Sequence, residues 1–580
     1  MTATRIRRRD VPQQFPGDAW DGQHPVMRRV YAARGVETAA EIAPGLAQLA
    51  RPETLGGLDK ACDLLIEAID RDQRILVVGD FDCDGATGAA LAVRGLRLLG
   101  AQSVDFEVPH RLQHGYGLSP ALVADLPQPL PDLLITVDSG IACVAGVKAA
   151  RDAGCRVIVT DHHLPSERLP EADAIVNPNQ EGDAFPSKAL AGVGVMFYLL
   201  LALRARLRAD GRFEAGREPD LSVLLDLVAV GTVADMVPLD QNNRTLVSAG
   251  LRRIRAGRCQ PGIAALAQVA NRPLPNLSAT DIGFTIGPRI NAAGRLEDMR
   301  VGIACLLADD PGDAHELASM LDQINRERRE VQQQMLDQAE ASLDGIDVDD
   351  ANTAAAIVVH DAGWHPGVVG LVASRLKDRL HRPTIALAPV DPDQPTGEWR
   401  GSARSIPGFH LRDALAEVDR RQPGLMIRFG GHAMAAGLSI EAENIPRLAS
   451  GLAEVAGDWL TPEQLAQCHF SDGPLAGGDF SRELAEQLRD GGPWGQAFPE
   501  PAFDNRFAVT SWRVVGERHL KLSLQGLDEA DGTQIDAIAF GAWQGEPPPA
   551  RVQLLYQLAT DDYRDRHGVQ LVVRNLWAAD

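Results

Sequence analysis

The sequence has 580 residues, 45% of them hydrophobic and 23% charged, an ordinary globular composition in a chain too long for one hydrophobic core. The formal net charge of −22 excludes a protein that grips nucleic acid over a broad basic surface, so any such contact must be a local basic channel. The seven cysteines form no C-x-x-C pair, the basic N-terminus lacks an apolar signal segment, and no apolar run is long enough to span a membrane. We therefore expect a cytoplasmic protein of about three or four domains, without a zinc or iron–sulfur site.

Four apolar stretches in the first part of the chain run directly into acidic residues. Apolar runs of this length, bounded by Gly and Asp, are typical of strands buried on both faces of a parallel sheet. Ligands of open parallel sheets bind beyond the carboxyl ends of the strands. The predicted strands and the residues that follow them are Ile75–Gly79 before Asp80, Asp82 and Asp84; Leu133–Val137 before Asp138; Arg156–Thr160 before Asp161, His162 and His163; and Leu227–Val233 before Asp235.

The six carboxylates and two imidazoles at these strand ends predict a metal centre. A single Asp after a strand is more often a helix N-cap or a turn residue. Three acidic clusters together with Asp-His-His at one sheet edge favour the metal interpretation, because so much like charge is unstable without cations. Carboxylate and imidazole ligands suit Mn²⁺ or Mg²⁺. This many carboxylates can share one between two ions about 3.5–4 Å apart, the geometry that cleaves phosphate esters.

Helical patterns between the strands predict a doubly wound α/β domain over residues 50–250, after an N-terminal extension over 1–49. The predicted helices are Thr87–Leu99, Pro120–Asp125 and Ala142–Ala153, and Val104–Val108 is a further strand. Strands and helices that alternate at this spacing form right-handed crossovers of a parallel sheet.

A helical connection over 251–310 leads to a long polar helix over 311–345, and a helix polar on most sides usually bridges two lobes. A second α/β domain follows over 350–456, with strands Ala355–Val359 and Pro383–Leu387 and a helix over Gly367–Leu380. We also expect a helix of small residues after His432, whose first backbone N–H groups would favour an anion.

The C-terminal part, 468–580, predicts a small β-barrel. Several short strands separated by turn residues favour a barrel, and a five-stranded barrel of OB topology would suit single-stranded nucleic acid or a protein contact. The predicted strands are Phe507–Val515, Leu520–Leu524, Ile535–Phe540, Val552–Leu558 and Gln570–Val573.

Eight motifs in a fixed order resemble a known superfamily. GDFDCDG (79–85), VDSG (137–140), DHH (161–163) and GTVADMVPL (231–239) are similar to the DHH phosphoesterases. PRINAAGR (288–295), WHPGVVGLVASRL (364–376), GSARS (401–405) and GGHAMAAG (430–437) narrow the resemblance to the RecJ family, the single-strand-specific 5′→3′ DNA exonucleases of bacteria. The match covers nearly the whole chain. The chain departs from the family's motifs in two places. Phe81 replaces the usual Tyr of the first motif, and the motif Gly-Ser-Ala-Arg (401–404) lacks a second Gly that is common in the family. Neither departure removes a metal ligand or a charged contact.

The resemblance implies a DHH catalytic domain, a bridging helix, a DHHA1-like domain and an OB-like domain. It also assigns the metal ligands: Asp80 and Asp82 to one ion; Asp84, His162 and Asp235 to the other; and Asp138 to both. It further implies that Asp161 orients His162 and that His163 faces the scissile phosphate.

The same resemblance assigns residues that contact DNA. Four residues of this chain are similar to the family's end-binding residues, which recognise the terminal 5′ phosphate: Arg111, Tyr116, Ser402 and Arg404. Arg289, Asn291 and Arg295 would line the path of the strand, and His432 would touch a phosphate near the cut. An individual Arg is often only part of a surface ion pair. For Arg289 and Arg295, the sequence therefore leaves open whether the side chain contacts DNA or only an acidic neighbour.

The implied activity is degradation of single-stranded DNA to mononucleotides in DNA repair and recombination, by a monomer that works with single-strand-binding protein and a RecQ-type helicase. One alternative is a DHH-superfamily phosphodiesterase that acts on short oligonucleotides or dinucleotides. The C-terminal barrel and the long helix argue against it, because they extend the binding surface well past a dinucleotide. A second alternative is a scaffold protein with a dead active site, and the intact ligand positions argue against that.

Overall fold

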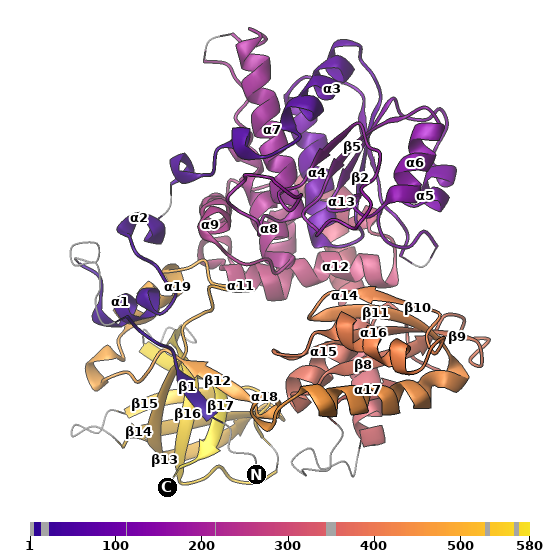
Figure 1. Ribbon diagram of the computed structural model, residues 1–580. Helices are drawn as coiled ribbons and strands as arrows, with labels where there is room; N and C mark the ends of the chain where they lie inside the picture. Colours follow the sequence, from indigo (N-terminus) through magenta and orange to yellow (C-terminus); the bar gives the residue numbers. More distant parts are fainter. Residues whose placement is uncertain are drawn as a thin grey trace. The chain divides into compact units, whose positions relative to one another are not determined.

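The computed structural model describes residues 5–12, 22–43, 45–111, 113–214, 216–343, 355–527, 534–543, 545–561 and 568–579. The chain forms two compact units (Figure 1). The larger unit comprises Arg8–Ile324 and Ser471–Asp580, and the smaller unit comprises Met1–Arg7 and Asn325–Phe470.

A five-stranded parallel sheet lies at the centre of the larger unit, in the order β3-β2-β4-β5-β6. All residues of β2 and β4 are buried, as their apolar sequences require. The strand order reverses between β2 and β4, so the carboxyl ends of these two strands border a topological switch point. The strands are β2 (Ile75–Gly79), β3 (Val104–Glu107), β4 (Leu133–Val137), β5 (Arg156–Thr160) and β6 (Ala174–Val176).

Alternate residues of each strand enter two different cores, which confirms the doubly wound prediction. Ile75 and Val77 of β2 join the core beneath α3, α4 and α7. Leu76 and Val78 join the core beneath α5 and α6. Figure 1 shows these two helical layers on either side of the sheet. The helices are α3 (Leu58–Asp70), α4 (Cys83–Leu98), α5 (Pro120–Asp125), α6 (Val144–Asp152) and α7 (Gly192–Ala209).

The strand predicted over Leu227–Val233 is wrong, because these residues belong to helix α8 (Leu225–Ala234). The helix lies inside the core, against α4, α7 and α9, and its residues from Leu225 to Thr232 are all buried. A helix that is buried on every side is apolar all round, so its sequence resembles that of a buried strand. Asp235 therefore follows the end of a helix and not the end of a strand.

Further helices extend the larger unit and lead into α14. The predicted long helix is confirmed as α14, although positions 344 and 345 lie outside the described residues. The boundary between the two units falls within α14, after Ile324. The elements are α9 (Gln241–Arg255), α10 (Pro261–Val269), α11 (Ala279–Asp281), the π-helical turn η6 (Ile282–Ile286), α12 (Gly287–Leu296), α13 (Arg300–Leu307) and α14 (Pro311–Leu343).

The C-terminal strands form the closed five-stranded barrel that the sequence predicts, in the order β13-β14-β15-β17-β16. The β15–β17 pair is parallel and the other pairs are antiparallel. The strands are β13 (Phe503–Val515), β14 (His519–Gly526), β15 (Gln534–Ala539), β16 (Arg551–Asp561) and β17 (Gly568–Ala578).

The smaller unit contains a five-stranded mixed sheet, in the order β10-β11-β9-β8-β7, and its own hydrophobic core. This second α/β arrangement agrees with the sequence prediction. The elements are β7 (Ile357–His360), α15 (Val369–Leu380), β8 (Thr384–Pro389), β9 (Glu398–Arg404), α16 (Leu411–Arg421), β10 (Arg428–Gly431), β11 (Ala435–Glu441) and α17 (Ile445–Trp459).

The helix predicted after His432 is wrong, because Ala435–Glu441 is strand β11, antiparallel to both β10 and β9. Ala436, Leu438 and Ile440 are buried at every second position, which is the strand period. The anion site expected at a helix start is therefore absent from this described segment.

The remaining elements are short, and they complete the described structure. No helix among the described residues is long and apolar enough to cross a membrane. These elements are β1 (Arg5–Arg8), α1 (Pro25–Ala32), α2 (Ala39–Ile42), η2 (Leu46–Gln48), η3 (Pro52–Thr54), η4 (Leu221–Leu224), η5 (Leu274–Asn276), η7 (Ala442–Asn444), α18 (Pro462–Leu465), β12 (Cys468–Ser471), η8 (Gly477–Asp479) and α19 (Arg482–Asp490).

The close packing of α9 on α8 gives a stability prediction. A Cβ atom added at Gly250 of α9 would overlap the carbonyl oxygen of Leu225 and lie 2.5 Å from Cβ of Ala229. We expect Gly250→Ala to lower the free energy of unfolding by about 1–3 kcal/mol through overpacking. In Gly457→Ala, the same change in α17 meets no atom within 4 Å and should be neutral or stabilising by up to about 1 kcal/mol. Thermal unfolding of both variants tests the account, and equal midpoints would contradict it.

Candidate metal centre

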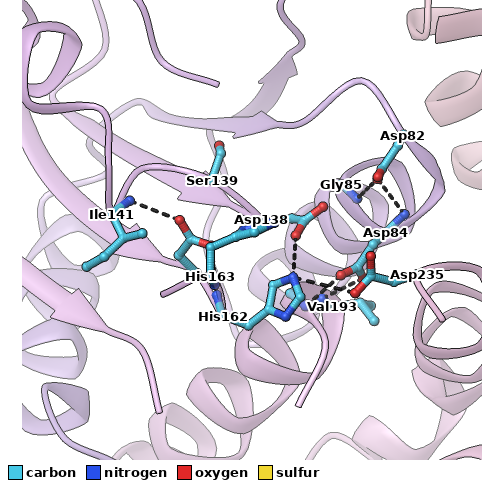
Figure 2. A network of polar contacts seen from close by, with 12 residues as sticks. Asp82, Asp84, Gly85, Asp138, Ser139, Ile141, His162, His163, Val193 and Asp235 are labelled. Carbon is cyan, nitrogen blue, oxygen red and sulfur yellow. Dashed lines mark hydrogen bonds and ion pairs between the residues drawn. The ribbon is translucent and has the colours of Figure 1, made fainter. Parts of the chain in front are cut away.

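The predicted ligands of the larger unit come together at the switch point of the sheet. Asp80 follows β2, Asp82 and Asp84 lie at the start of α4, and Asp138 follows β4. Figure 2 shows the side chains of Asp82, Asp84, Asp138, His162 and Asp235 pointing toward one common region. The sheet and the end of α8 together bring close residues that lie more than 150 positions apart in the sequence.

The ligand atoms form groups of three whose members all lie within 4.8 Å of one another. Asp80, Asp82 and Asp138 form one group, and Asp84, His162 and Asp235 form another. Asp138 also groups with His162 and His163. These groups match the two ligand sets that the sequence resemblance implies, with Asp138 beside both.

Backbone amides at two helix starts hold Asp82 and Asp84. Oδ1 of Asp82 caps α4 by accepting hydrogen bonds from the N–H groups of Asp84 (2.9 Å) and Gly85 (3.1 Å). The two oxygens of Asp84 accept from the N–H groups of Gly192 (2.6 Å) and Val193 (2.9 Å) at the start of α7. A carboxylate offers about four lone-pair sites, so each side chain can serve the backbone and still bind a cation.

The backbone at Asp138 is strained, and glycine leaves room for it. Asp138 has a φ of 60°, in the left-handed region that non-glycine residues rarely adopt. A Cβ atom added at Gly192 would lie 2.5 Å from Cβ of Asp138 and 2.9 Å from its Oδ1. The start of α7 can therefore approach the carboxylate cluster only because position 192 has no side chain.

Three buried polar atoms of the cluster have no hydrogen-bond partner within the described residues: Oδ1 of Asp80, Oδ1 of Asp138 and Nε2 of His162. Nε2 of His162 does lie 3.1 Å from Oδ1 of Asp138 and 3.5 Å from Oδ2 of Asp235, but neither contact has the geometry of a hydrogen bond. Buried polar atoms without partners are costly. Oxygen and imidazole donors that converge in this way fit one or two divalent cations, which would satisfy all three atoms.

The electrostatics of the cluster agree with a cation site. Burial and then neighbouring carboxylates raise the pKa of Asp80 to about 8 and that of Asp235 to about 7. The same two causes raise the pKa values of Asp84 and Asp138 well above the usual range. Burial lowers the pKa of His162 to about 4, so its imidazole is neutral and able to bind a metal at physiological pH. Without cations, some of these carboxyl groups therefore stay protonated at neutral pH, whereas bound cations would allow all of them to ionise.

Asp161 orients His163, which corrects the expected pairing with His162. Oδ1 of Asp161 lies 2.7 Å from Nδ1 of His163, whereas its contact with His162 is a hydrogen bond from the backbone N–H (2.7 Å). Although burial opposes it, the hydrogen bond to Asp161 raises the pKa of His163 to about 9. Tyr116 lies beside this pair, with its hydroxyl donating to the carbonyl oxygen of Asp138 (3.0 Å) and lying 3.2 Å from Nδ1 of His163.

Asn177 and Asn179 hold the loop that carries the two histidines, a role that the sequence analysis missed. Nδ2 of Asn177 donates to the carbonyl oxygen of His163 (2.9 Å), and Nδ2 of Asn179 donates to that of His162 (2.6 Å). The turn-forming run Asn-Pro-Asn just after β6 is the sequence signal that could have identified them.

Arg111 and Asn291 lie at the β2 side of the cluster. The guanidinium of Arg111 lies 3.8 Å from the ring centroid of Phe81, and its Nε donates to the carbonyl oxygen of Gly294 (2.9 Å). Oδ1 of Asn291 accepts from the N–H group of Cys83 (2.8 Å), so this side chain supports the start of α4.

Arg289 is buried in an ion pair, and Arg295 is half-buried. Nη2 of Arg289 lies 2.8 Å from Oδ1 of Asp322, and its Nη1 donates to the carbonyl oxygen of Thr285 (2.8 Å). The ion-pair alternative that the sequence left open therefore describes Arg289. Arg295 lies on α12, one residue after Gly294.

Ser402, Arg404 and His432 all lie in the smaller unit. Nη1 of Arg404 donates to Oγ of Ser402 (2.9 Å) and to the carbonyl oxygen of Ala403 (2.8 Å). Burial lowers the pKa of Arg404, and no acidic side chain among the described residues forms an ion pair with it. A half-buried guanidinium without a counter-ion is suited to a phosphate ligand. His432 is exposed in the turn between β10 and β11.

Comparisons with known proteins match three family models: the DHH family, N-terminal domain, at residues 74–232; the DHHA1 domain at 351–458; and the RecJ OB domain at 471–575. The chain is 48% identical to the single-stranded-DNA-specific exonuclease RecJ of Dickeya dadantii over 581 aligned positions, which cover 99% of each chain. It also resembles the crystal structures of Thermus thermophilus RecJ in complex with Mn²⁺ (30% identity, TM-score 0.80) and with Mg²⁺ (29% identity, TM-score 0.75). These matches cover 100% of this chain and 80% and 79% of the solved chains.

The raised pKa values predict how stability depends on pH in the absence of divalent ions. Asp80 and Asp235, with pKa values of about 8 and 7, keep protons in the folded state that the unfolded chain has lost above its ordinary pKa of 3.8. Stability therefore falls as pH rises from 6.5 to 8, and His163, whose folded-state pKa is about 9 against an ordinary 6.5, acts in the same direction. These three groups outweigh His162, the one opposing group, which is half-protonated at pH 6.5 only in the unfolded chain. We expect the unfolding midpoint in EDTA to be lower at pH 8 than at pH 6.5, and excess Mn²⁺ to raise it most at pH 8. A midpoint in EDTA that rises with pH would contradict the account.

Proposed function

The chain belongs to the RecJ family of single-stranded-DNA-specific exonucleases, and we propose that it degrades single-stranded DNA from the 5′ end to mononucleotides with two divalent metal ions. The observation that carries this proposal is that Asp138 belongs to one ligand group with Asp80 and Asp82 and to another with His162, which is itself grouped with Asp84 and Asp235. Mn²⁺ and Mg²⁺ are the ions named for the solved relatives, and the oxygen-rich ligands suit both. We assign the activity to DNA repair and recombination in the cytoplasm.

The ligand groups support hydrolysis of a phosphodiester. Asp80 and Asp82 would hold one ion, Asp84, His162 and Asp235 the other, and Asp138 both. Two divalent ions bound there would lower the pKa of a water molecule and offset negative charge on the phosphate. The rigid backbone contacts of Asp82 and Asp84 keep these carboxylates in place before substrate binds, so little reorganisation is needed during the reaction.

His163 is the residue that we assign to the scissile phosphate. Asp161 and Tyr116 both contact the Nδ1 side of its ring, which leaves Nε2 for a ligand. The hydrogen bond to Asp161 raises the pKa of His163 and so favours the imidazolium, which can donate a charge-assisted hydrogen bond from Nε2 to a phosphate oxygen. Asp161 is thus a positioning residue. We assign His432 to a phosphate near the cut, and Arg295 and Asn291 to the path of the strand.

The finer parts of the proposal concern the strand end, the barrel and the partners. We propose that Arg404 and Ser402 bind the terminal 5′ phosphate and that Arg111 and Tyr116 contact the 5′ end of the strand near the metal ions. The barrel offers a stacking surface for bases, since Trp512 is 41% exposed and stacks on Trp543 with ring centroids 5.6 Å apart. Family resemblance supports a monomer that works with single-strand-binding protein and a RecQ-type helicase.

The shared ligand gives a direct test of the two-metal proposal. Asp138→Ala should lower the exonuclease rate by at least on the order of 10³-fold, about 4 kcal/mol, because one side chain serves both ions. The fold should survive, since the change removes one charge from a repelling cluster. Asp59→Ala, a change at an exposed carboxylate on α3, is the matched control and should leave the rate unchanged. An Asp138→Ala rate in excess Mn²⁺ close to that of the wild type would exclude the shared-ligand role.

The recognition of the strand end can be tested at Arg404. Arg404→Ala should lower kcat/KM on 5′-phosphorylated single strands by a factor that corresponds to about 2–3 kcal/mol, because a half-buried charge-assisted contact is lost. On strands with a 5′ hydroxyl the loss should be smaller, and the four measurements complete a thermodynamic cycle. Arg412→Ala, on the exposed side of α16 in the same unit, is the control. Equal losses on the two substrates would show that Arg404 does not read the terminal phosphate.

A further inference from the structure

The two most exposed large hydrophobic side chains of the described residues belong to segments that adjoin Asp235 of the metal centre. Phe284 is 76% exposed and Met236 is 70% exposed. A single exposed apolar residue on a protein surface is ordinary. Two such residues at the edge of one catalytic site, where a single-stranded substrate has to pass, need a specific explanation.

Phe284 lies in a π-helical turn that packs against the end of α8. A Cβ atom added at Gly283 would lie 3.5 Å from Cγ1 of Val233, and one at Gly287 would lie 3.1 Å from Cβ of Ala234. Ala234 directly precedes the metal ligand Asp235. Ile282 and Ile286 of the same turn are fully buried, so the turn is anchored by its other residues while Phe284 remains exposed. π-Helical turns of this kind are frequent at functional sites.

Met236 directly follows Asp235 and combines exposure with backbone strain. Its φ is 61°, in the left-handed region that Gly or Asn would occupy with less strain. Packing does not explain a long apolar side chain there, because most of its surface is in contact with solvent. Strained residues of this type are concentrated at ligand-binding sites.

Helix α12 defines which side of the metal centre these residues occupy. The helix begins with Gly287 beside Ala234, continues with Asn291 at the N–H group of Cys83, and reaches Gly294, whose carbonyl oxygen binds Arg111. Phe284 therefore lies on the Asp235 side of the cluster and Arg111 on the opposite side. Ten residues separate Phe284 from Gly294, which is about 15 Å along a helix.

We propose that Phe284 and Met236 form an apolar platform that stacks against a nucleobase of the single strand, at a nucleotide beyond the one at the 5′ end. This inference rests on the proposed exonuclease function and on the placement of the 5′ end near Arg111. A neutral base adds no charge to the crowded carboxylates, and every base has a π-face, so the contact serves any sequence. The platform would hold the strand in register while the phosphate between it and the 5′ end is positioned for cleavage.

A scan with abasic nucleotides tests the platform. Single-turnover release of the first nucleotide in Mn²⁺ is measured on 5′-phosphorylated strands that carry one abasic residue, moved stepwise through the first six positions. On the intact strand, Phe284→Ala should lower the rate at subsaturating enzyme by roughly 5- to 100-fold, the range found when a base-stacking aromatic is removed. This loss should nearly disappear at one internal abasic position, where the wild type has already lost the same contact.

The control for the scan is Leu98→Ala. Leu98 is 43% exposed and lies at the end of α4 opposite the Asp82 cap, so its removal should change no rate at any position. The platform is refuted if Phe284→Ala matches the wild type on the intact strand, if its loss is the same at every abasic position, or if the loss disappears only at the terminal nucleotide. Failure of the proposed function looks different, since the wild type itself would then release no nucleotide from the intact strand.

Met236 provides a second and independent pair of variants. Asn is compatible with the left-handed backbone at position 236, so Met236→Asn should be at least as stable as the wild type. It should nevertheless release the first nucleotide more slowly, and this loss should disappear at the same internal abasic position as the loss in Phe284→Ala. Met236→Leu keeps the apolar surface and should restore most of the rate. An unchanged Mn²⁺-induced rise of the unfolding midpoint shows that Asp235 still binds metal in both variants. A Met236→Asn loss that is the same at every abasic position would remove Met236 from the platform.

Discussion

The mutual repulsion of buried carboxylates is the constraint on which the catalytic unit depends. Asp80, Asp84 and Asp138 are each at most 3% exposed, and together with Asp82 and Asp235 they share a small region at the switch point of the sheet. The chain tolerates this arrangement because backbone N–H groups at two helix starts hold the carboxylates and because divalent cations offset their charge. Both features depend on the sheet, which fixes where α4 and α7 begin relative to the ends of β2 and β4.

The structural role of an aspartate and the metal-binding role that we propose for it coincide in this protein. Asp82 is a normal N-cap of α4, and the same carboxylate belongs to a ligand group. Asp84 accepts two N–H groups of α7 and belongs to the other ligand group. A cap fixes a carboxylate more rigidly than a flexible surface position would. The helices that build the fold therefore also give the metal ligands their geometry.

Much of the fold, and the convergence of the residues that we propose as ligands, could be predicted from the sequence, because buried parallel strands and their acidic ends have strong local patterns. The error at α8 arose because a fully buried helix has no polar face, so its residues resemble a buried strand. The error at β11 arose because small residues are compatible with both a helix and a strand. The pairing of Asp161 with His163 depends on side-chain directions in a loop held by Asn177 and Asn179, which sequence spacing does not specify.

The central claim, that two cations are bound by ligand groups that share Asp138, is tested most directly by counting bound ions. Titration of the metal-free protein with Mn²⁺, followed by calorimetry, should give two ions per chain for the wild type. Asp235→Asn removes a ligand from only one group and should leave one tightly bound ion. A single ion in the wild type, or two equally tight ions in the variant, would contradict the account.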